Sequence, residues 1–387
     1  MRKCIIGLVS VVFIVSCKKD SNNNTSNPGE EDCTVKASAN SGAIVATQYI
    51  VSFDPAISSR TASRINLDET GKSILKRNTI DVSALKQSYP GEPGGFIATI
   101  TPAQADILSH DPSVQAIEPD RIVALGTCFT VVAPRLITWN INKVGYGNGI
   151  GKTAWIIDSG VDYGHPDLTV DEARSKSFIP GQTSANDSNG HGTHVAGIIA
   201  AKNNTFGVLG VASGASIVAL KVLDKDGEGN LSYIIQAIAY VNTKASAGDV
   251  VNMSVGGESG SSILDQQVQT TAARGIYFAI AAGNEHKLAN TSSPARVNGS
   301  NIYTVSAIDS LDNFASFSNY GNDVVDYAAP GVDILSTWSQ GRYAYASGTS
   351  MAAPHVAGLL LLRGRNITSS GTAKNDPDGT PDPIAHY

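Results

Sequence analysis

The sequence predicts an α/β protein with a mostly parallel sheet flanked by helices on both faces, preceded by a small α+β domain. Two observations support this class. From about residue 139 onward, apolar or β-branched runs alternate with segments of helical spacing, which is typical of parallel sheets whose strands are buried on both faces. Residues 48–123 instead show short strand patterns around one helix. A chain of 387 residues has room for both units.

Residues 1–17 have the pattern of a signal peptide. Arg2 and Lys3 precede an apolar run from Ile5 to Val15, which is too short for a permanent membrane helix. The run ends at Ser16-Cys17, similar to the lipobox of bacterial lipoproteins, in which the cysteine is lipidated. Ordinary cleavage near Ser16 is the alternative. Either process exports the protein, so we expect it to be secreted or lipid-anchored at the bacterial cell envelope, with membrane contact only through Cys17.

Residues 18–47 are expected to form a flexible tether, because Lys18 to Asp32 is rich in Asn, Ser, Asp and Glu and almost without apolar residues. Two cysteines, Cys33 and Cys128, remain in the exported part. In an oxidising compartment they would either pair or stay as two thiols, and the sequence leaves both options open.

The small domain over residues 48–123 is followed by a linker over residues 124–138. The expected strands are Tyr49–Val51, Gly95–Ile100 and Val114–Glu118. A helix is expected from Thr101 to Ser109, because proline suits the first turn of a helix and Pro102 follows Thr101.

The larger domain over residues 139–365 should contain the parallel sheet. Its expected strands are Thr153–Ile157, Ser216–Val222, Val250–Ser254, Tyr277–Ala281 and Ile302–Ala307, and its expected intervening helices are Leu231–Lys244 and Ile263–Arg274. After Leu362 the helical pattern stops. Residues 366–387 contain Asp-Pro-Asp-Gly-Thr-Pro-Asp-Pro and are therefore predicted to form an irregular tail.

Composition argues against several classes of partner. Only 16% of the residues are charged, the formal net charge is -6, and there is no long basic run. Nucleic acid and anionic membrane surfaces are therefore poor candidates. The glycine-rich stretches do not form a Walker loop.

Three motifs contain the residue types of nucleophilic catalysis. Ser350 lies among small residues just before the apolar run Val356–Leu362, and a helix N-terminus stabilises a developing anion. His191 lies where a glycine-rich loop meets the apolar run Val195–Ala201, and histidine is the residue type best suited to remove a hydroxyl proton at neutral pH. Asp158 ends a buried strand pattern and would orient the imidazole. The alternatives are a helix cap for Ser350 and a turn cap for Asp158.

The three blocks resemble those of the subtilisin-like serine proteases, or subtilases. Residues 191–223, HGTHVAGIIAAKNNTFGVLGVASGASIVALKVL, are similar to the bacterial subtilisins in particular. The resemblance covers about Trp139 to Leu362. It implies an exported endopeptidase that hydrolyses protein or peptide substrates through Asp158, His191 and Ser350 with an acyl-enzyme intermediate.

The small domain, with its closing run Val-x-x-Ile-Glu-Pro-Asp over residues 114–120, resembles the inhibitor-like propeptide of subtilases. The resemblance implies that it templates folding, occupies the cleft as the enzyme's own partner, and is removed autocatalytically between about Val123 and Arg135. An independent binding domain is the alternative.

The resemblance also assigns the oxyanion and substrate sites. Asn284, in the block Ala281-Ala282-Gly283-Asn284, would donate to the oxyanion together with the backbone N–H of Ser350. Two glycine-containing segments would hold an extended peptide as an added strand. They consist of Ser254, Val255, Gly256 and Gly257 on one side and of Gly227, Glu228 and Gly229 on the other. The S1 pocket would lie between residues 254–257 and the residues Ala281, Ala282 and Gly283.

A structural Ca²⁺ site follows from the same resemblance. Asp167 and Asn204 match side-chain ligands of the bacterial subtilisins, and the loop of residues 202–208 would add further oxygens at Lys202, Phe206 and Val208. A solvated surface loop is the alternative. His194 follows His191 by three residues, but H-E-x-x-H is absent, so a packed helix residue is expected rather than a metal ligand.

Two other functions compete with a general endopeptidase. One is a catalytically silent cell-surface binding protein on a subtilase scaffold, because a fold alone does not grant activity. The other is a dedicated processing protease with one partner protein. The complete set Asp158, His191, Asn284 and Ser350 argues against the first.

Overall fold

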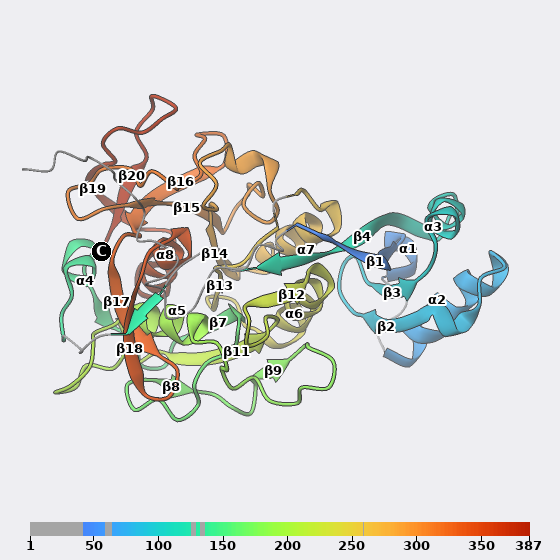
Figure 1. The fold of residues 1–387 in the computed structure, drawn as a ribbon, viewed down its shortest axis with the longest axis horizontal. Helices are drawn as coiled ribbons and strands as arrows, with labels where there is room; N and C mark the ends of the chain where they lie inside the picture. The colour runs from blue at the N-terminus through green and yellow to red at the C-terminus, as the bar shows by residue number, and fades with distance from the viewer. Residues whose placement is uncertain (1–41, 59–63, 125–128, 132–135, 258) are drawn as a thin grey trace, which may run out of the picture.

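The computed structural model describes residues 42–58, 64–124, 129–131, 136–257 and 259–387. The predicted signal peptide, Cys17, Cys33, Cys128 and most of the expected tether lie outside the described residues. Within the described ranges, no helix is both long and apolar enough to span a membrane. Figure 1 shows a large α/β unit joined to a smaller α+β unit, and the predicted fold class is confirmed.

The large unit is built on a ten-stranded sheet. In spatial order its strands are β19 (Thr368–Thr372), β20 (Pro383–His386), β16 (Val325–Pro330), β15 (Ile302–Ile308), β14 (Tyr277–Ala281), β13 (Val250–Met253), β7 (Thr153–Asp158), β11 (Ser216–Lys221) and β8 (Thr169–Val170), with β9 (Lys176–Ser177) also paired to β11. All pairs from β20 to β8 are parallel. The carboxyl ends of β7, β13 and β14 therefore meet at one edge, where open α/β sheets bind ligands.

Helices cover both faces of this sheet (Figure 1). One face packs on α4 (Trp139–Val144), α5 (His191–Ala200) and α8 (Thr349–Arg363), and the other on α6 (Leu231–Lys244) and α7 (Ser262–Ala272). Strand β7 shows why its sequence is continuously apolar. Ala154 and Ile156 belong to the first core, whereas Trp155 and Ile157 belong to the second, because successive strand residues point to opposite faces.

Two smaller sheets complete the large unit. Strand β6 (Gly147–Asn148) pairs with β10 (Ala212–Ser213), and β17 (Ile334–Trp338), β18 (Arg342–Ala346) and β5 (Phe129–Val131) form an antiparallel sheet. A short 3₁₀ helix, η3, spans Ala289–Thr291. Strand β5 lies inside the segment expected to be a linker. Its three residues gain order from pairing with β18, a distant segment that local sequence cannot indicate.

The C-terminal segment differs from the irregular tail expected for residues 366–387. Strand β20 joins the central sheet parallel to β16, and β19 pairs with β20. Ile384 and Ala385 are fully buried, so this short apolar stretch extends the core. Its Pro- and Asp-rich flank hides the strand from a composition-based prediction, although the buried Asp382 accepts a hydrogen bond from Ser306 in β15 (2.5 Å).

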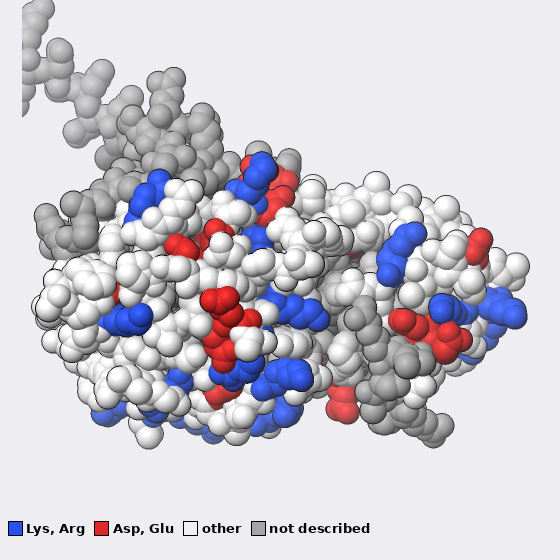
Figure 2. Space-filling view, turned by 90° about the horizontal axis from the view of Figure 1, so that it is seen from below, with Lys and Arg blue, Asp and Glu red and all other residues white. Residues whose placement is uncertain are grey.

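The small unit is a sheet of β1 (Ile44–Phe53), β2 (Leu85–Tyr89), β3 (Gly95–Thr99) and β4 (Val114–Ala124) with helices α1 (Pro55–Ser58), α2 (Arg64–Arg77), η2 (Val82–Ala84) and α3 (Pro102–Ser109). Strand β1 begins four residues before the predicted domain boundary. Helix α3 begins one residue later than expected, after Thr101, whose side chain forms a capping box with Gln104. Helix α2 and strand β2 were not predicted. On the face of the molecule in Figure 2, groups of Lys and Arg alternate with groups of Asp and Glu.

Candidate active site

Asp158 and His191 meet at the carboxyl edge of the sheet. Asp158 is the last residue of β7 and His191 the first residue of α5. The His191 Nδ1 atom lies 2.7 Å from Oδ1 and 2.9 Å from Oδ2 of Asp158, and both side chains are fully buried. A carboxylate so placed orients the imidazole and stabilises its charged form.

The turn before His191 depends on a glycine. Gly190 has φ +124°, and a Cβ there would lie 2.2 Å from Cε2 of Trp338. Any other side chain would therefore meet both backbone strain and a clash. This close packing against Trp338 fixes where α5 starts and hence where the imidazole lies.

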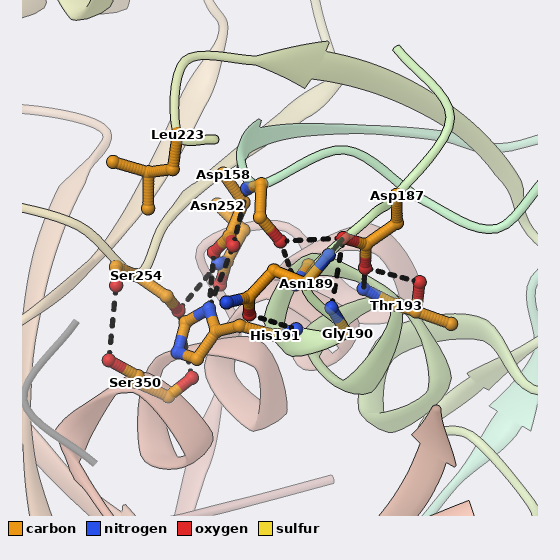
Figure 3. Close-up of polar contacts among 12 residues, drawn as sticks. Asp158, Asp187, Asn189, Gly190, His191, Thr193, Leu223, Asn252, Ser254 and Ser350 are labelled. Atoms are coloured by element: carbon orange, nitrogen blue, oxygen red, sulfur yellow. Dashed lines mark hydrogen bonds and ion pairs between the residues drawn. The ribbon is translucent and has the colours of Figure 1, made fainter. Parts of the chain in front are cut away.

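Ser350 enters the site from the second residue of α8. Figure 3 shows the His191 ring between Asp158 and Ser350. The Ser350 hydroxyl donates to the Ser254 carbonyl oxygen (3.0 Å), and the Ser254 hydroxyl donates to the Ser350 carbonyl oxygen (2.8 Å). A hydroxyl has one proton, so the Ser350 side chain must turn from Ser254 toward the imidazole before it can transfer that proton.

Asn284 follows β14 and lies against the start of α8. Its Oδ1 atom accepts hydrogen bonds from the backbone N–H (2.8 Å) and the hydroxyl (3.0 Å) of Thr349. The Thr349 hydroxyl in turn accepts from the N–H of Gly283 (3.0 Å). These bonds determine which end of the amide faces Thr349, so the Nδ2 end is the one that can serve as a donor. The sequence did not single out Thr349.

The two segments assigned to substrate binding enclose the end of the small domain. Strand β12 (Glu228–Asn230) pairs antiparallel with β4, with Gly229 opposite Val123. On the other side, a Cβ at Gly257 would lie 4.0 Å from Cγ1 of Val123. Val123 is fully buried in one apolar cluster with Leu223 and Val255. The small domain therefore occupies the place where the sequence predicted an extended peptide.

Two carboxylates of β4 also cap helices of the large unit. Glu118 Oε1 accepts from the Ser262 hydroxyl (2.7 Å) and the Ile263 N–H (3.0 Å) at the start of α7. Asp120 accepts from the hydroxyl (2.6 Å) and N–H (3.0 Å) of Ser232 at the start of α6. Helix N-termini offer unpaired donors to anions. Neither contact could be predicted from the sequence, because two ordinary acidic residues do not identify distant helix ends.

His194 is a packed helix residue, as predicted. It is fully buried, and its Nε2 atom lies 3.0 Å from the Ile334 carbonyl oxygen and 3.1 Å from that of Ala344. Burial lowers the pKa of His194 to about 3, so the ring is neutral at physiological pH.

The predicted calcium ligands Asp167 and Asn204 lie together, with Asn204 Nδ2 2.6 Å from Asp167 Oδ1. The carboxylate also accepts from the Val208 N–H (3.0 Å) and the Tyr343 hydroxyl (3.2 Å). Lys202 donates to the Pro166 carbonyl oxygen, and Phe206 donates its N–H to Asn204 Oδ1. Among the described residues there is no group of three or more His, Cys, Asp or Glu side chains arranged for a metal. Carboxylate and amide oxygens nevertheless suit Ca²⁺. An ion beside Asp167 requires Asn204 to turn Oδ1 instead of Nδ2 toward it.

A serine, a histidine and a buried aspartate at the carboxyl edge of a parallel sheet are the groups expected of a serine hydrolase of α/β fold. Residues 151–368 match the subtilase family model and residues 48–126 match the peptidase inhibitor I9 model. The chain belongs to the subtilase family and is a serine endopeptidase with a propeptide domain.

Individual relatives agree with this assignment. Subtilisin NAT of Bacillus subtilis subsp. natto is 39% identical over 80% of this chain and 84% of its own length. Alkaline serine exoprotease A of Vibrio alginolyticus is 35% identical over 82% of this chain, but the match spans only 60% of that relative. The crystal structure of a cold adapted subtilisin-like serine proteinase has a TM-score of 0.57 and 35% identity, covering 65% of this chain and 98% of that one.

Proposed function

We propose that this chain is an exported endopeptidase in which Asp158, His191 and Ser350 form the catalytic triad. The observation that carries the proposal is the buried Asp158–His191 pair, with Ser350 on the other side of the ring (Figure 3). The Ser350 oxygen attacks the peptide carbonyl as His191 takes its proton. His191 then protonates the leaving amine. In the second half of the reaction, His191 takes a proton from water, the water oxygen attacks the acyl carbonyl, and His191 returns the proton to the departing Ser350 oxygen.

Asn284 and the backbone N–H of Ser350 are proposed to hold the oxyanion. Thr349 fixes the Asn284 oxygen, so the amide N–H groups are oriented before the reaction begins. A donor that needs no reorganisation stabilises charge better than water does.

A serine-directed fluorophosphonate tests the activity. We expect one label per molecule of processed protein, located on Ser350 by peptide mapping, because only an activated serine reacts. The same protein should not label after His191→Ala. Absence of labelling in the wild-type protein would instead favour a binding protein on this scaffold.

The small unit is proposed to act as the enzyme's own inhibitor and to be removed by the active site that it covers. Its β4 strand pairs with β12 as a substrate strand would, and it leads directly to the expected cleavage region between Val123 and Arg135. Most of that region lies outside the described residues. Main-chain pairing explains how such an enzyme accepts many peptide sequences, including its own.

Removing the two helix-capping charges should weaken the hold of the propeptide. In Glu118→Gln/Asp120→Asn, neutral amides replace carboxylates that accept four hydrogen bonds from the large unit, and hydrogen bonds to charged groups are worth more than neutral ones. When the processed protein is diluted, activity should appear at the concentration where the propeptide dissociates. For this variant we expect that concentration to be about 10- to 100-fold higher than for the wild type. Activity per fluorophosphonate-labelled site against dilution measures this.

The matched control is Glu69→Gln/Asp106→Asn, which removes the same charge from exposed positions on α2 and α3 of the same domain. It should leave the dilution curve unchanged. Equal dilution curves for the capping variant and this control would show that the two helix-capping carboxylates do not contribute to inhibition.

A Ca²⁺ ion is proposed at Asp167 and Asn204. It would link the turn that precedes β8 to the loop of residues 202–208. Binding to the folded state alone stabilises a protein by mass action. We therefore expect EDTA to lower the Tm of the processed enzyme and excess CaCl₂ to restore it. Asp167→Asn should have a lower Tm that EDTA no longer changes. A wild-type Tm that is the same with and without EDTA would eliminate the ion.

Export is proposed from the signal-like residues 1–17, and lipid anchoring from Cys17. The anchor would lie on the propeptide side of the cleavage region, so processing would release the peptidase unit from the membrane. Fractionation should then find the precursor of Ser350→Ala with the membranes and the processed enzyme in the medium. A Cys17→Ala precursor that stays with the membranes would contradict the anchor.

A further inference from the structure

A buried carboxylate outside the proposed triad organises the turn that carries His191. Asp187 is 7% exposed and lies four residues before His191. Its two oxygens accept five hydrogen bonds. Oδ1 accepts from Ser159 Oγ (3.0 Å), Asn189 N (2.9 Å) and Gly190 N (2.9 Å), and Oδ2 accepts from Thr193 N (3.0 Å) and Thr193 Oγ1 (2.6 Å). The turn is thus wrapped around this carboxylate (Figure 3).

The donors of Asp187 lie on both sides of His191 in the chain. Asn189 and Gly190 precede it, and Thr193 lies in the first turn of α5. The N–H of His191 itself donates to the Asn189 side-chain oxygen (3.1 Å). Because backbone groups before and after His191 are bonded to one carboxylate, the position of the imidazole depends on Asp187.

Ser159 extends this hold to the aspartate of the triad. Its N–H donates to Asp158 Oδ1 (2.7 Å), its hydroxyl donates to Asp187, and the same hydroxyl accepts from the N–H of Gly192 (3.0 Å). A carboxylate only accepts hydrogen bonds, so Asp187 determines the direction of the Ser159 hydroxyl. Ser159 therefore links the Asp158 strand end to the His191 turn.

Lys221 supplies the opposite charge on the other side of Ser159. Lys221 is 1% exposed and donates to the carbonyl oxygens of Ser159 (2.6 Å) and Leu223 (2.8 Å). Its ammonium attracts the Asp187 carboxylate, although burial raises the pKa of Asp187 and lowers that of Lys221. Hydrogen bonds and the attraction of an opposite charge both offset the cost of burying a charge. The Ser159 residue is thus held by an anion at its hydroxyl and a cation at its carbonyl.

We propose that Asp187 is a positioning residue for catalysis, whose carboxylate acts through Ser159 to keep Asp158 and His191 in register. The inference rests on the proposed triad and adds to it a residue that touches neither substrate nor reacting atoms. A misplacement of about 1 Å in a catalytic group lowers turnover by about 10²-fold. A substitution of Asp187 that keeps the side-chain volume but changes its hydrogen bonds should therefore be enough to reveal the positioning role.

The test is Asp187→Asn, which keeps the shape but turns an N–H₂ group toward backbone N–H donors. We expect kcat per fluorophosphonate-labelled site to fall by about 10- to 100-fold, with KM changed less than about twofold. A purely structural role would lower the number of labelled sites and the Tm but leave kcat per site unchanged, and that result would overturn the proposal. Asp171→Asn, at a partly exposed acid paired with Arg174, is the matched control and should leave kcat unchanged.

Ser159→Ala provides a second route, since it removes one hydroxyl and leaves the turn's other bonds to Asp187 in place. We expect it to lower kcat per site as well, and the double variant Ser159→Ala/Asp187→Asn to be less impaired than the product of the two single effects. If the losses of kcat in the two single variants multiply in the double variant, the two residues act independently and the proposal is overturned. If Asp187→Asn does not fold, an unchanged kcat in Ser159→Ala overturns the proposal instead. A wild-type protein that neither labels nor cleaves would overturn the triad along with it, whereas an active wild type with an equally active Asp187→Asn defeats the positioning role alone.

Discussion

Ser350→Ala should reduce turnover of a peptide substrate by a factor on the order of 10⁶, the magnitude known for removal of the same hydroxyl in subtilisin. The substitution removes the hydroxyl that is proposed to attack, which belongs to the residue beside the His191 ring in Figure 3, and leaves the fully buried pair Asp158–His191 intact. Because processing is expected to use the same site, the variant should also accumulate as the full-length precursor. Initial rates at saturating substrate and an electrophoretic comparison of precursor and processed forms measure the two effects.

Ser369→Ala is the matched control for this variant. Ser369 is exposed on β19, and its hydroxyl bonds only locally, to the carbonyl oxygen and N–H of Gly371. It should be processed and turn over substrate like the wild type. Processing of the Ser350→Ala precursor at the normal rate in a pure sample would show that cleavage does not need this serine.

Asn284→Ala should lower kcat by about 10²–10³, the size found for the oxyanion asparagine of subtilisin, or about 3–4 kcal/mol of transition-state stabilisation. The amide is bonded through its oxygen to Thr349, so its loss removes an N–H donor that was oriented in advance. KM should change little, because the charge that this donor meets develops only in the transition state. Steady-state kinetics on the processed enzyme separate the two constants.

Asn290→Ala is the control for loss of an amide side chain that lies close to Asn284 in the sequence but has no proposed role in the reaction. Asn290 lies in η3 at the surface and donates to Asp323 (2.6 Å), away from Thr349. Its kcat should equal that of the wild type. A rise in KM with unchanged kcat in Asn284→Ala would assign Asn284 to ground-state binding instead.

The parts of this protein that could be predicted from sequence are those whose determinants are local. Asp158, His191 and Ser350 each lie in a short motif of glycines and apolar residues, because the chain must turn sharply at the end of a strand or the start of a helix. Strand β7 was predictable for a related reason, since burial on both faces demands an unbroken apolar run.

The parts that were missed depend on distant partners. Strand β5 pairs with the distant strand β18, and β20 joins the central sheet through β16. Glu118 gains its role from the N-terminus of α7, and Asp187 from donors in two separate segments. None of these residues differs in type or local pattern from an ordinary surface acid or loop residue, so their contributions became visible only in three dimensions.

Asp158, His191 and Ser350 are proposed to work as one unit, and a set of single and double variants tests this cooperation. Residual peptide hydrolysis should be measured for His191→Ala, Ser350→Ala and the double variant, with protein amounts matched by absorbance and folding checked by circular dichroism. We expect the same residual rate for all three, because removing either group already abolishes attack by an activated serine. A double variant slower than the wild type by the product of the two separate losses would contradict this, because the two residues would then act independently.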